Sequence, residues 1–542
     1  MIPFQKSIKL LSLALIIVIG GCTKLDENFN SSLTNAEAAS SLGTAGTGLL
    51  LEAAYSDVAG PFHGQSEIFS LQENTTDESL VPTRGGDWDD NGVWRVLHAH
   101  TWNADHGQFL SVFNGLNKLN FDATNVLAFS PTPAQAAEAK FLRALSLFYL
   151  LDLYGQYPIR NPGDNLLNAP EVKSGAAGVD FIISELNAAL PNLPATNSIG
   201  RANPDAARVL LMKCYLQKGT LVNRAAPTFA AADMQQVITL GNAIIASGKY
   251  SFTPEYFDNF SPDNSVTSKE GIFTYVNNAG SPVNNGGIGV RWNMTLHYNS
   301  YTPANPNAGW NGFSTISDFY NAFGTSGATT FSRADSVLDQ RIGGRFYAKS
   351  TPISGLRPGF LVGQQFNEKG EAIKDRKGAP LAYTPQIAAN MIETGSNLEV
   401  TGIRVIKYSP DYNNYGGGPA GNDLMIFRYA DVVLMVAEAK QRTNDAAGAL
   451  VMVNQLRVAR KAAPFTVLPL VNPNFVNDPN TLLAERGREL YWESHRRTDL
   501  LRFGVYLKPW QLKTSLDPKN LVFPVPNQAL AANPNLKQNP GY

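Results

Sequence analysis

A pair of helix-forming segments separated by only two residues sets the strongest limit on this fold. Residues 428–442 and 445–461 both carry apolar side chains at helical spacing, and only Thr443 and Asn444 lie between them. A connection this short predicts two antiparallel helices that pack side by side. Ala and Leu at the expected contacts of several such helices favour tetratricopeptide-like packing, in which helix pairs stack on one another.

The segment 133–154 has the clearest helix boundaries. Thr132 can cap the first turn, Pro133 suits the first helical position, and Gln135 completes a capping box. Gly155 is expected to end the helix. Apolar residues cover a wide part of its surface, so we expect this helix to be buried on more than one side.

Other segments divide the chain into helical and loop-rich parts. Asn203 and Pro204 begin a further helix, which we expect to end at Gly219, and another helix begins near Asp478. Residues 250–425 contain short apolar stretches, many Asn, Gly and Pro residues and few helical runs. We therefore predict a large loop-and-strand insertion on a helical scaffold.

These patterns predict a mainly α protein. It has a tetratricopeptide-like scaffold of helical pairs, mainly in residues 42–250 and 425–542, with a large loop-rich, partly β insertion. The helical repeats are unevenly spaced and lack the full tetratricopeptide signature. A plain solenoid is therefore not expected.

The N-terminus has the pattern of a lipoprotein leader. Two lysines precede an apolar run, and Gly20-Gly21-Cys22 follows. We predict a signal peptide over residues 1–21, acylation of the Cys22 thiol, and a flexible tether over residues 22–41. The alternative is an ordinary signal peptide followed by a stray cysteine.

Charge and cysteine content exclude some classes of protein. The formal net charge is -1, so no basic excess draws in nucleic acid. Cys214 is the second of two cysteines. If Cys22 is acylated, Cys214 has no partner for an internal disulfide, and we interpret it as a buried, inert thiol.

Five segments, in order along the chain, resemble proteins of the SusD/RagB family. They are Glu138–Ile159, Gly200–Leu216, Phe427–Ala439, Glu485–Gly504 and Phe523–Tyr542. A sixth stretch, Val81–Trp102, resembles a motif in one branch of the family. Gly20-Gly21-Cys22 resembles a bacterial lipobox, and the acidic pair Asp26-Glu27 that soon follows resembles the surface-export signals of Bacteroidetes lipoproteins.

The resemblance implies a fold, a location and a partner. It implies a single SusD-like domain over residues 42–542, with a variable ligand region mainly in residues 60–105 and 250–425. The protein would be lipid-anchored to the outer membrane through acylated Cys22 and would face the cell exterior. It would capture oligosaccharide or polysaccharide without catalysis and deliver it to a SusC-like TonB-dependent β-barrel transporter.

Three other functions remain open at this point. One is a surface glycoside hydrolase, and another is a peptide-capturing binding protein of the RagB type. The third is a tetratricopeptide scaffold with no ligand of its own. Aromatic residues in loop-rich sequence disfavour the scaffold, because stacking rings in loops serve a ligand better than a helical framework.

Sugar binding needs flat apolar faces and a few directional polar groups. Trp88 is the strongest candidate, because Gly85, Gly86 and Asp87 indicate an exposed turn. The other candidates are aromatic or polar residues in the same motif or in the insertion: Asp77, Asp87, Trp94, Trp292, Tyr298, Tyr301, Trp310 and Arg404. Core packing is the alternative for each aromatic.

Two patterns invite a metal interpretation that we do not favour. Residues 87–92 match the first half of a calcium loop, D-x-D-x-N-G, but His98 stands where the closing glutamate belongs. His98, His100 and His106 are close in sequence but lack the spacing of a zinc site. We expect no cofactor, with calcium as the open alternative.

A dense charged run spans residues 485–502 in a chain that is otherwise poor in charge. Two of its carboxylates could form the catalytic pair of a glycosidase. We favour an ion-pair network that pins the last helices to the scaffold, because nearby arginines would keep each carboxylate ionised. The sequence contains neither a G-x-S-x-G motif nor a P-loop.

Overall fold

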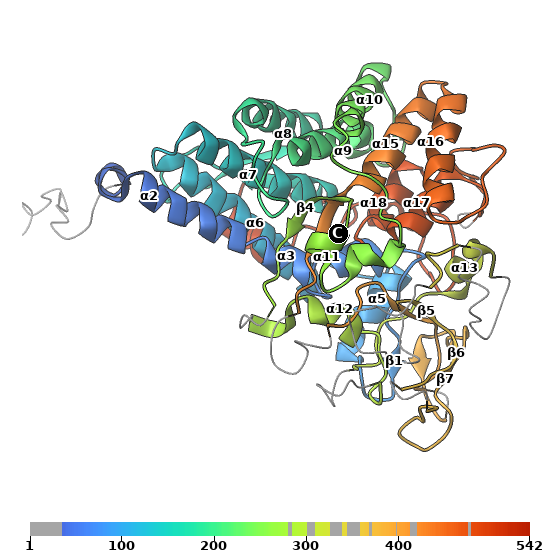
Figure 1. The fold of residues 1–542 in the computed structure, drawn as a ribbon. Helices are drawn as coiled ribbons and strands as arrows, with labels where there is room; N and C mark the ends of the chain where they lie inside the picture. Colours follow the sequence, from blue (N-terminus) through green and yellow to red (C-terminus); the bar gives the residue numbers. More distant parts are fainter. Residues whose placement is uncertain are drawn as a thin grey trace, which may run out of the picture.

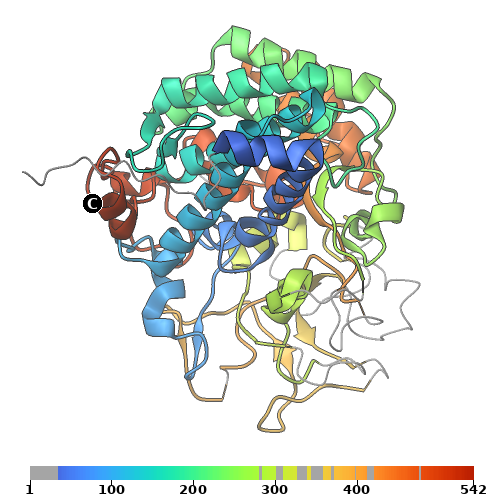
Figure 2. The ribbon, with the colours of Figure 1, turned by 90° about the vertical axis from the view of Figure 1, so that its left-hand side faces the viewer.

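The computed structural model describes residues 35–279, 284–300, 309–325, 339–343, 358–367, 371–396, 398–411, 420–474 and 478–542. Helices from both ends of the chain form one layered body, and the loop-rich segments gather beneath it (Figure 1). The view turned by 90° shows the same division between a helical upper part and a loop-rich lower part (Figure 2). The mainly α fold with a loop-rich insertion is confirmed.

The helices have the following bounds. The N-terminal part contains α2 (Asn35–Ser56), α3 (Ala59–His63), α4 (Ile68–Glu73), α5 (Val93–Ala99), α6 (Gly107–Ala128), α7 (Pro133–Tyr154), α8 (Gly175–Ala189), α9 (Pro204–Val222) and α10 (Ala231–Ala246). Short helices α11 (Asn264–Thr267), α12 (Val290–Asn293) and α13 (Ser317–Tyr320) lie in the insertion. The C-terminal part contains α15 (Tyr429–Arg442), α16 (Ala446–Ala459), α17 (Leu482–Leu490), α18 (Arg496–Arg502) and α19 (Asn527–Ala532).

The long helices pack in an unbroken series. Helix α6 packs on α7, α7 on α8, α8 on α9, α9 on α10, α10 on α15 and α15 on α16. The contact between α10 and α15 joins the two halves of the scaffold across the insertion. Each helix thus covers the apolar face of the next, as in tetratricopeptide-like packing.

The strands are short and pair two by two. In parallel, β1 (Thr83–Arg84) pairs with β8 (Ile392–Glu393). The antiparallel pairs are β2 (Gln156–Ile159) with β3 (Glu171–Ser174), β4 (Gly271–Tyr275) with β10 (Leu424–Arg428), β5 (Gly359–Leu361) with β9 (Arg404–Ile406), and β6 (Gly363–Gln364) with β7 (Ala382–Tyr383). The β1–β8 pair ties the Trp88 loop to the insertion.

Helix α7 follows its predicted boundaries. The Thr132 hydroxyl accepts from the backbone N–H of Gln135, and the Gln135 side chain accepts from the backbone N–H of Thr132. Gly155 ends the helix in a left-handed conformation with φ 72°. Every side chain from Phe141 to Tyr154 is buried, so this helix forms the centre of the scaffold.

Two helix boundaries differ from the prediction. Helix α9 is capped by Asn203 as predicted, but it continues past Gly219 to Val222. A Cβ at Gly219 would lie 1.6 Å from the carbonyl oxygen of Thr228, so this glycine serves a close backbone approach instead of a helix end. Helix α17 begins after Thr481, whose hydroxyl accepts from the Ala484 N–H, and not near Asp478.

The predicted helical hairpin is confirmed. Helices α15 and α16 pack together, and Asp445 caps α16 by accepting from the Gly448 N–H at 2.9 Å. The predicted tether needs one correction, because α2 begins at Asn35 and therefore includes residues 35–41.

The charged run of residues 485–502 forms the predicted ion-pair network. Glu489 pairs with Arg428 at 2.8 Å and with Arg460 at 2.7 Å, and Arg502 pairs with Glu438 at 2.7 Å. All of these side chains are buried. The network therefore fastens α17 and α18 to β10, α15 and α16. In the described part of the chain, no helix has the length and apolar character needed to cross a membrane.

Candidate functional site

The loop that follows β1 carries Trp88 on an unusual backbone. Trp88 has φ 59°, Asp90 φ 40° and Asn91 φ 55°, all in the left-handed region. Such a conformation is rare for a bulky residue and persists only where the surrounding structure enforces it. Strained positions of this kind cluster at ligand sites, so the backbone itself marks this loop as a candidate.

Other aromatic rings hold Trp88 in place. Its ring meets Trp94 at 5.3 Å and Phe313 at 5.5 Å in edge-to-face contacts, and its Nε1 donates to the Trp310 carbonyl at 2.6 Å. A Cβ at Gly312 would lie 2.4 Å from the Trp88 ring, so only glycine leaves room for this packing. Trp88 and Trp310 remain partly exposed, whereas Trp94 is buried behind them.

Polar groups from three separate segments meet beside these rings. The Tyr298 hydroxyl donates to Asp87 Oδ2, and the Arg376 guanidinium lies 4.0 Å from the centre of the Tyr298 ring. Arg376 Nη2 is 3.8 Å from Asp87 Oδ2. Burial and the neighbouring Asp87 carboxylate raise the pKa of Tyr298, so its phenol stays neutral and donates.

We call this surface the aromatic face. It consists of Asp87, Trp88, Tyr298, Trp310 and Arg376. It combines partly exposed rings with a carboxylate and a guanidinium that are both about half exposed. Rings of this kind stack on C–H faces, while the two charged groups bond hydroxyls, which is the chemistry that sugar recognition requires.

Besides Trp94, three candidate residues lie inside the protein and do not reach the aromatic face. Asp77 is buried and forms a two-point ion pair with Arg496 at 2.7 and 2.6 Å. Trp292 is 1% exposed. Arg404 is fully buried and donates to the carbonyls of Thr401 and Gly402. These residues support the fold, so we leave them out of the proposed ligand contacts.

Two predicted residues have no structural account. Tyr301 and Cys22 lie outside the described residues. Acylation of Cys22 and a ligand contact from Tyr301 therefore stay predictions from the sequence.

Sequence reasoning missed Arg376 and its partner Glu399. Arg376 stands in a charged turn, and such turns are usually solvated surface. Glu399 is 4% exposed and accepts from Arg376 Nε at 2.6 Å. No spacing connects these positions to Trp88, because the fold brings them together from distant parts of the chain.

The calcium-like motif directs its carboxylates to different partners. Asp87 accepts from Tyr298, Asp89 from Arg95 at 2.8 Å, and Asp90 from Trp94 Nε1 at 2.7 Å. The three groups therefore do not converge on one point as calcium ligands must. In the described residues no group of three or more His, Cys, Asp or Glu side chains is arranged to hold a metal ion.

The clustered histidines bond backbone carbonyls. His98 Nε2 lies 2.8 Å from the Gln511 oxygen, His100 Nε2 lies 2.9 Å from the Thr75 oxygen, and His106 Nε2 lies 3.0 Å from the Val93 oxygen. All three rings are buried. They therefore tie loop backbones to the core.

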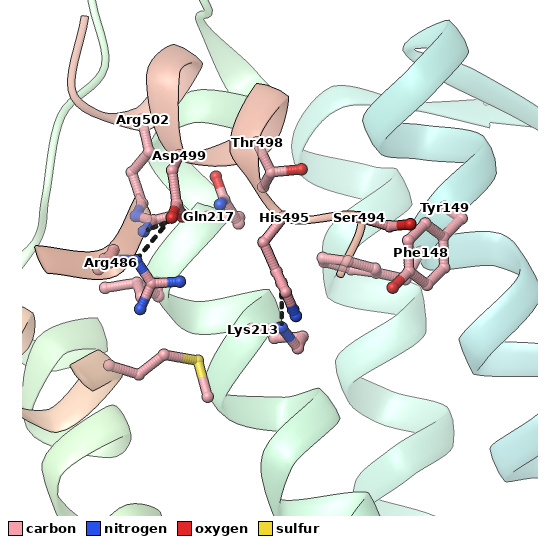
Figure 3. Close-up of a pocket in the computed structure, with 12 residues that line it drawn as sticks. Phe148, Tyr149, Lys213, Gln217, Arg486, Ser494, His495, Thr498, Asp499 and Arg502 are labelled. Carbon is pink, nitrogen blue, oxygen red and sulfur yellow. Dashed lines mark hydrogen bonds and ion pairs between the residues drawn. The ribbon is translucent and has the colours of Figure 1, made fainter. Parts of the chain in front are cut away.

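A small cavity lies among the buried charges at α9 and α18 (Figure 3). Arg486 and Arg502 both pair with Asp499, while the Lys213 ammonium pairs with Asp431 at 2.6 Å and lies beside His495. The volume of this cavity is about 20 Å³, which is enough for roughly one water molecule and too little for a sugar ring. We therefore interpret this pocket as part of the scaffold.

The electrostatics of the network disfavour acid catalysis. Burial alone would raise the pKa of Glu489, but Arg460 and Arg428 outweigh it and hold that pKa at about 2. Burial opposes the arginines at Asp499 too, yet Arg486 and Arg502 lower its pKa to about 2. A general acid needs the opposite shift, so these carboxylates are structural.

A second cavity, of about 210 Å³, lies between α6 and β2. Phe121 is the only aromatic ring among its lining residues, beside Pro158, Ile159 and Asn120. It is on the helical scaffold, away from the Trp88 loop, and we do not include it in the candidate site.

Comparison with known proteins defines the class of this fold. A SusD-like protein from Bacteroides fragilis superposes with a TM-score of 0.66 at 21% identity, covering 92% of this chain and 97% of that protein. A laminarin binding SusD-like protein superposes with a TM-score of 0.65 at 20% identity, covering 92% and 99%. The architecture is therefore the SusD-like helical fold.

Sequence comparison finds similarity to the same group of proteins. The model of the SusD family matches residues 269–515. The starch-binding protein SusD of Bacteroides thetaiotaomicron is 26% identical, with 90% of this chain and 88% of that protein covered. The SusD-like protein P25 of Formosa agariphila is 23% identical, with 88% and 83% covered. The chain is therefore similar in sequence to SusD family proteins along most of its length.

Proposed function

We propose that this protein is a cell-surface binding protein that captures glycans on the aromatic face without cleaving them. The observation that carries this proposal is the convergence of Trp88, Tyr298 and Trp310 with Asp87 and Arg376 on one partly exposed surface. These residues come from separate loop segments that the scaffold holds together. Stacking rings with flanking polar groups suit the alternating C–H and hydroxyl surfaces of a sugar.

The relatives support the same class of ligand. The relative with 26% identity is named for starch binding, and one protein of the same fold is named for laminarin binding. Starch and laminarin are both polymers of neutral sugars. The aromatic face fits such a ligand, because Arg376 is already paired with Glu399 and approaches Asp87.

A binding role suits the chemistry of the carboxylates near the face. Glu399 lies between Arg376 and His297, and these two donors outweigh its burial and lower its pKa. Glycoside hydrolysis needs one carboxyl group with a raised pKa beside the scissile bond. Glu399 has the opposite property, which favours capture over hydrolysis.

We further propose that acylated Cys22 anchors the protein to the outer membrane, facing the cell exterior. The residues between this anchor and α2 would act as a tether. The captured glycan would pass to a SusC-like TonB-dependent β-barrel. The leader sequence and the similarity to SusD family proteins support these steps.

Calorimetric titration tests the proposal. The protein from Thr23 onward is titrated with soluble starch, laminarin, other polysaccharides and short peptides, and the released reducing ends are measured in parallel. We expect one glycan to bind and Trp88→Ala to weaken binding at least about tenfold, as expected for a central aromatic contact. Phe181→Ala is the matched control, because it removes a partly exposed ring from α8 on the scaffold.

The other outcomes identify a different function. Release of reducing ends by the wild type would contradict the non-catalytic role and favour a surface hydrolase. Binding of peptides but not glycans would favour the peptide-capturing alternative. Equal loss of glycan affinity in both variants would place the site elsewhere.

A further inference from the structure

The Glu399 carboxylate is buried behind the aromatic face and accepts hydrogen bonds from Arg376 and His297. Glu399 Oε1 accepts from Arg376 Nε at 2.6 Å. Glu399 Oε2 accepts from His297 Nε2 at 2.7 Å and from the backbone N–H of Arg376 at 3.0 Å. Two of these three bonds come from Arg376, so Glu399 holds both the backbone and the side chain of that residue.

The histidine on the other side has a defined tautomer. The backbone N–H of Asn299 donates to His297 Nδ1 at 3.0 Å, so the ring proton is on Nε2, where it donates to Glu399. Burial lowers the pKa of His297 to about 4 although Glu399 opposes this effect. The imidazole is therefore neutral near pH 7. Arg376 is then the positively charged partner of the Glu399 carboxylate.

The turn that carries Arg376 is held at a second point. The Asn299 side-chain amide donates to the Lys374 carbonyl at 2.8 Å. The segment 297–299 therefore contacts both Glu399 and the 374–376 turn. Tyr298 lies in the middle of that segment, and this explains how its ring comes to lie under the Arg376 guanidinium at 4.0 Å.

Fixing Arg376 has a direct consequence for ligand binding. Its side chain is 47% exposed, and a free arginine at such a position loses much rotamer freedom when it binds. Because Glu399 takes the Nε–H, this loss has occurred before the ligand arrives. In the described residues neither Nη group of Arg376 makes a hydrogen bond, so both are available to a ligand.

We propose that Glu399 is a positioning residue that orients Arg376, and that Arg376 and Asp87 together recognise two adjacent hydroxyl groups of a glycan. This inference rests on the proposed function. Arg376 Nη2 and Asp87 Oδ2 are 3.8 Å apart, too far for a strong hydrogen bond to each other. Two adjacent hydroxyls can bond this pair side by side from the solvent, one accepting from the guanidinium while the other donates to the carboxylate.

A double-mutant cycle on glycan affinity tests the positioning role. The variants are Glu399→Gln, Arg376→Ala and the double variant, titrated with starch and laminarin oligosaccharides. We expect Arg376→Ala to weaken binding about tenfold and Glu399→Gln about fivefold, with little further loss when both are combined. Additive losses would overturn the proposal. They would mean that Glu399→Gln weakens binding equally with and without the Arg376 side chain, as expected of a residue that only stabilises the fold.

Two further ligands and variants test the hydroxyl pair. An oligosaccharide whose adjacent hydroxyls are O-methylated cannot donate to Asp87, and we expect the wild type to prefer the unmodified sugar about tenfold. Arg376→Ala and Arg376→Lys should both reduce that preference, because lysine lacks the forked donor geometry. An unchanged preference in Arg376→Ala would refute recognition by this pair.

A spectroscopic measurement tests the positioning without any glycan. In protein labelled with ¹⁵N at arginine, the Arg376 Nε–H held by Glu399 should give a slowly exchanging resonance, identified by its loss in Arg376→Lys. It should disappear in Glu399→Gln while the other arginine resonances and the melting temperature remain. Absence of this resonance in the wild type would refute the positioning role, whereas its presence without any glycan binding would refute only the proposed function.

Discussion

The substitution Glu78→Gln should make the stability of this protein less dependent on pH. Glu73 and Glu78 are both fully inside the protein, where Glu73 Oε1 accepts from the backbone N–H groups of Ser494 and His495. Within the described residues, neither oxygen of Glu78 nor Glu73 Oε2 has a hydrogen-bond donor. A carboxyl proton shared between the two side chains would supply one.

The surrounding charges do not compensate for the burial of both carboxylates. Arg496 lies 3.5 Å from Glu78, but it forms a shorter ion pair with Asp77. Burial raises the pKa of Glu73 to about 8, although backbone donors and Arg496 oppose the shift. Burial and the neighbouring Glu73 raise the pKa of Glu78 well above its ordinary value.

The sign follows from proton binding in the two states. Above pH 4.5 the unfolded chain has released these protons, while folded Glu73 keeps its proton until about pH 8 and the pKa of folded Glu78 is also well above its ordinary value. The folded state therefore binds more protons, and stability falls as pH rises between those values. For one carboxyl group, a shift from 4.5 to about 8 corresponds to on the order of 5 kcal/mol.

Urea unfolding at several pH values between about 5 and about 8 measures this effect. The side-chain amide that Glu78→Gln introduces can donate to Glu73. We therefore expect this variant to be less sensitive to pH than the wild type and more stable near pH 8, by several kcal/mol. Glu171→Gln is the control, because the Glu171 side chain is 63% exposed and its effect should be small at every pH. Parallel stability curves for Glu78→Gln and the wild type would refute the shared proton.

Three other outcomes test the face and the ion-pair network. Gly312→Ala places a Cβ 2.4 Å from the Trp88 ring, so calorimetry should show about a tenfold loss of glycan affinity. Arg502→Ala removes the two-point partner of buried Glu438, which keeps only Arg442 at 2.9 Å, and urea unfolding should show a loss of about 3 kcal/mol. Glu489 has a folded pKa of about 2, so its contribution is present above pH 4.5 and should fade as pH falls towards 2 in acid-unfolding curves followed by circular dichroism.

The parts of the fold that could be predicted depend on local interactions. The capping box at Thr132, the cap at Asn203 and the hairpin turn at Thr443 each involve residues within four positions of one another. Such bonds form wherever the local sequence allows a helix. The end of α9 could not be predicted. The backbone of Thr228, in the following loop, approaches Gly219 so closely that only glycine fits there, and the sequence does not show this contact.

The candidate site could also be predicted only in part from the sequence. A Gly-rich turn before Trp88 and aromatic residues in loops indicated which residues were worth considering. Burial then separated Trp88 and Tyr298 from Asp77 and Arg404, and burial depends on what packs over a side chain. A buried arginine and an exposed one have the same local signature in a loop.

The helical scaffold, the leader pattern and the charged run at 485–502 could be recognised from the order of the amino acids alone. The folded chain was needed to show that Arg376 and Glu399 lie beside Asp87 and Tyr298, which stand far away in the sequence. The difference is the range of the interactions. Caps and turns are stabilised by bonds between near neighbours, whereas the aromatic face is assembled by the packing of loops that β1, β8 and the scaffold bring together.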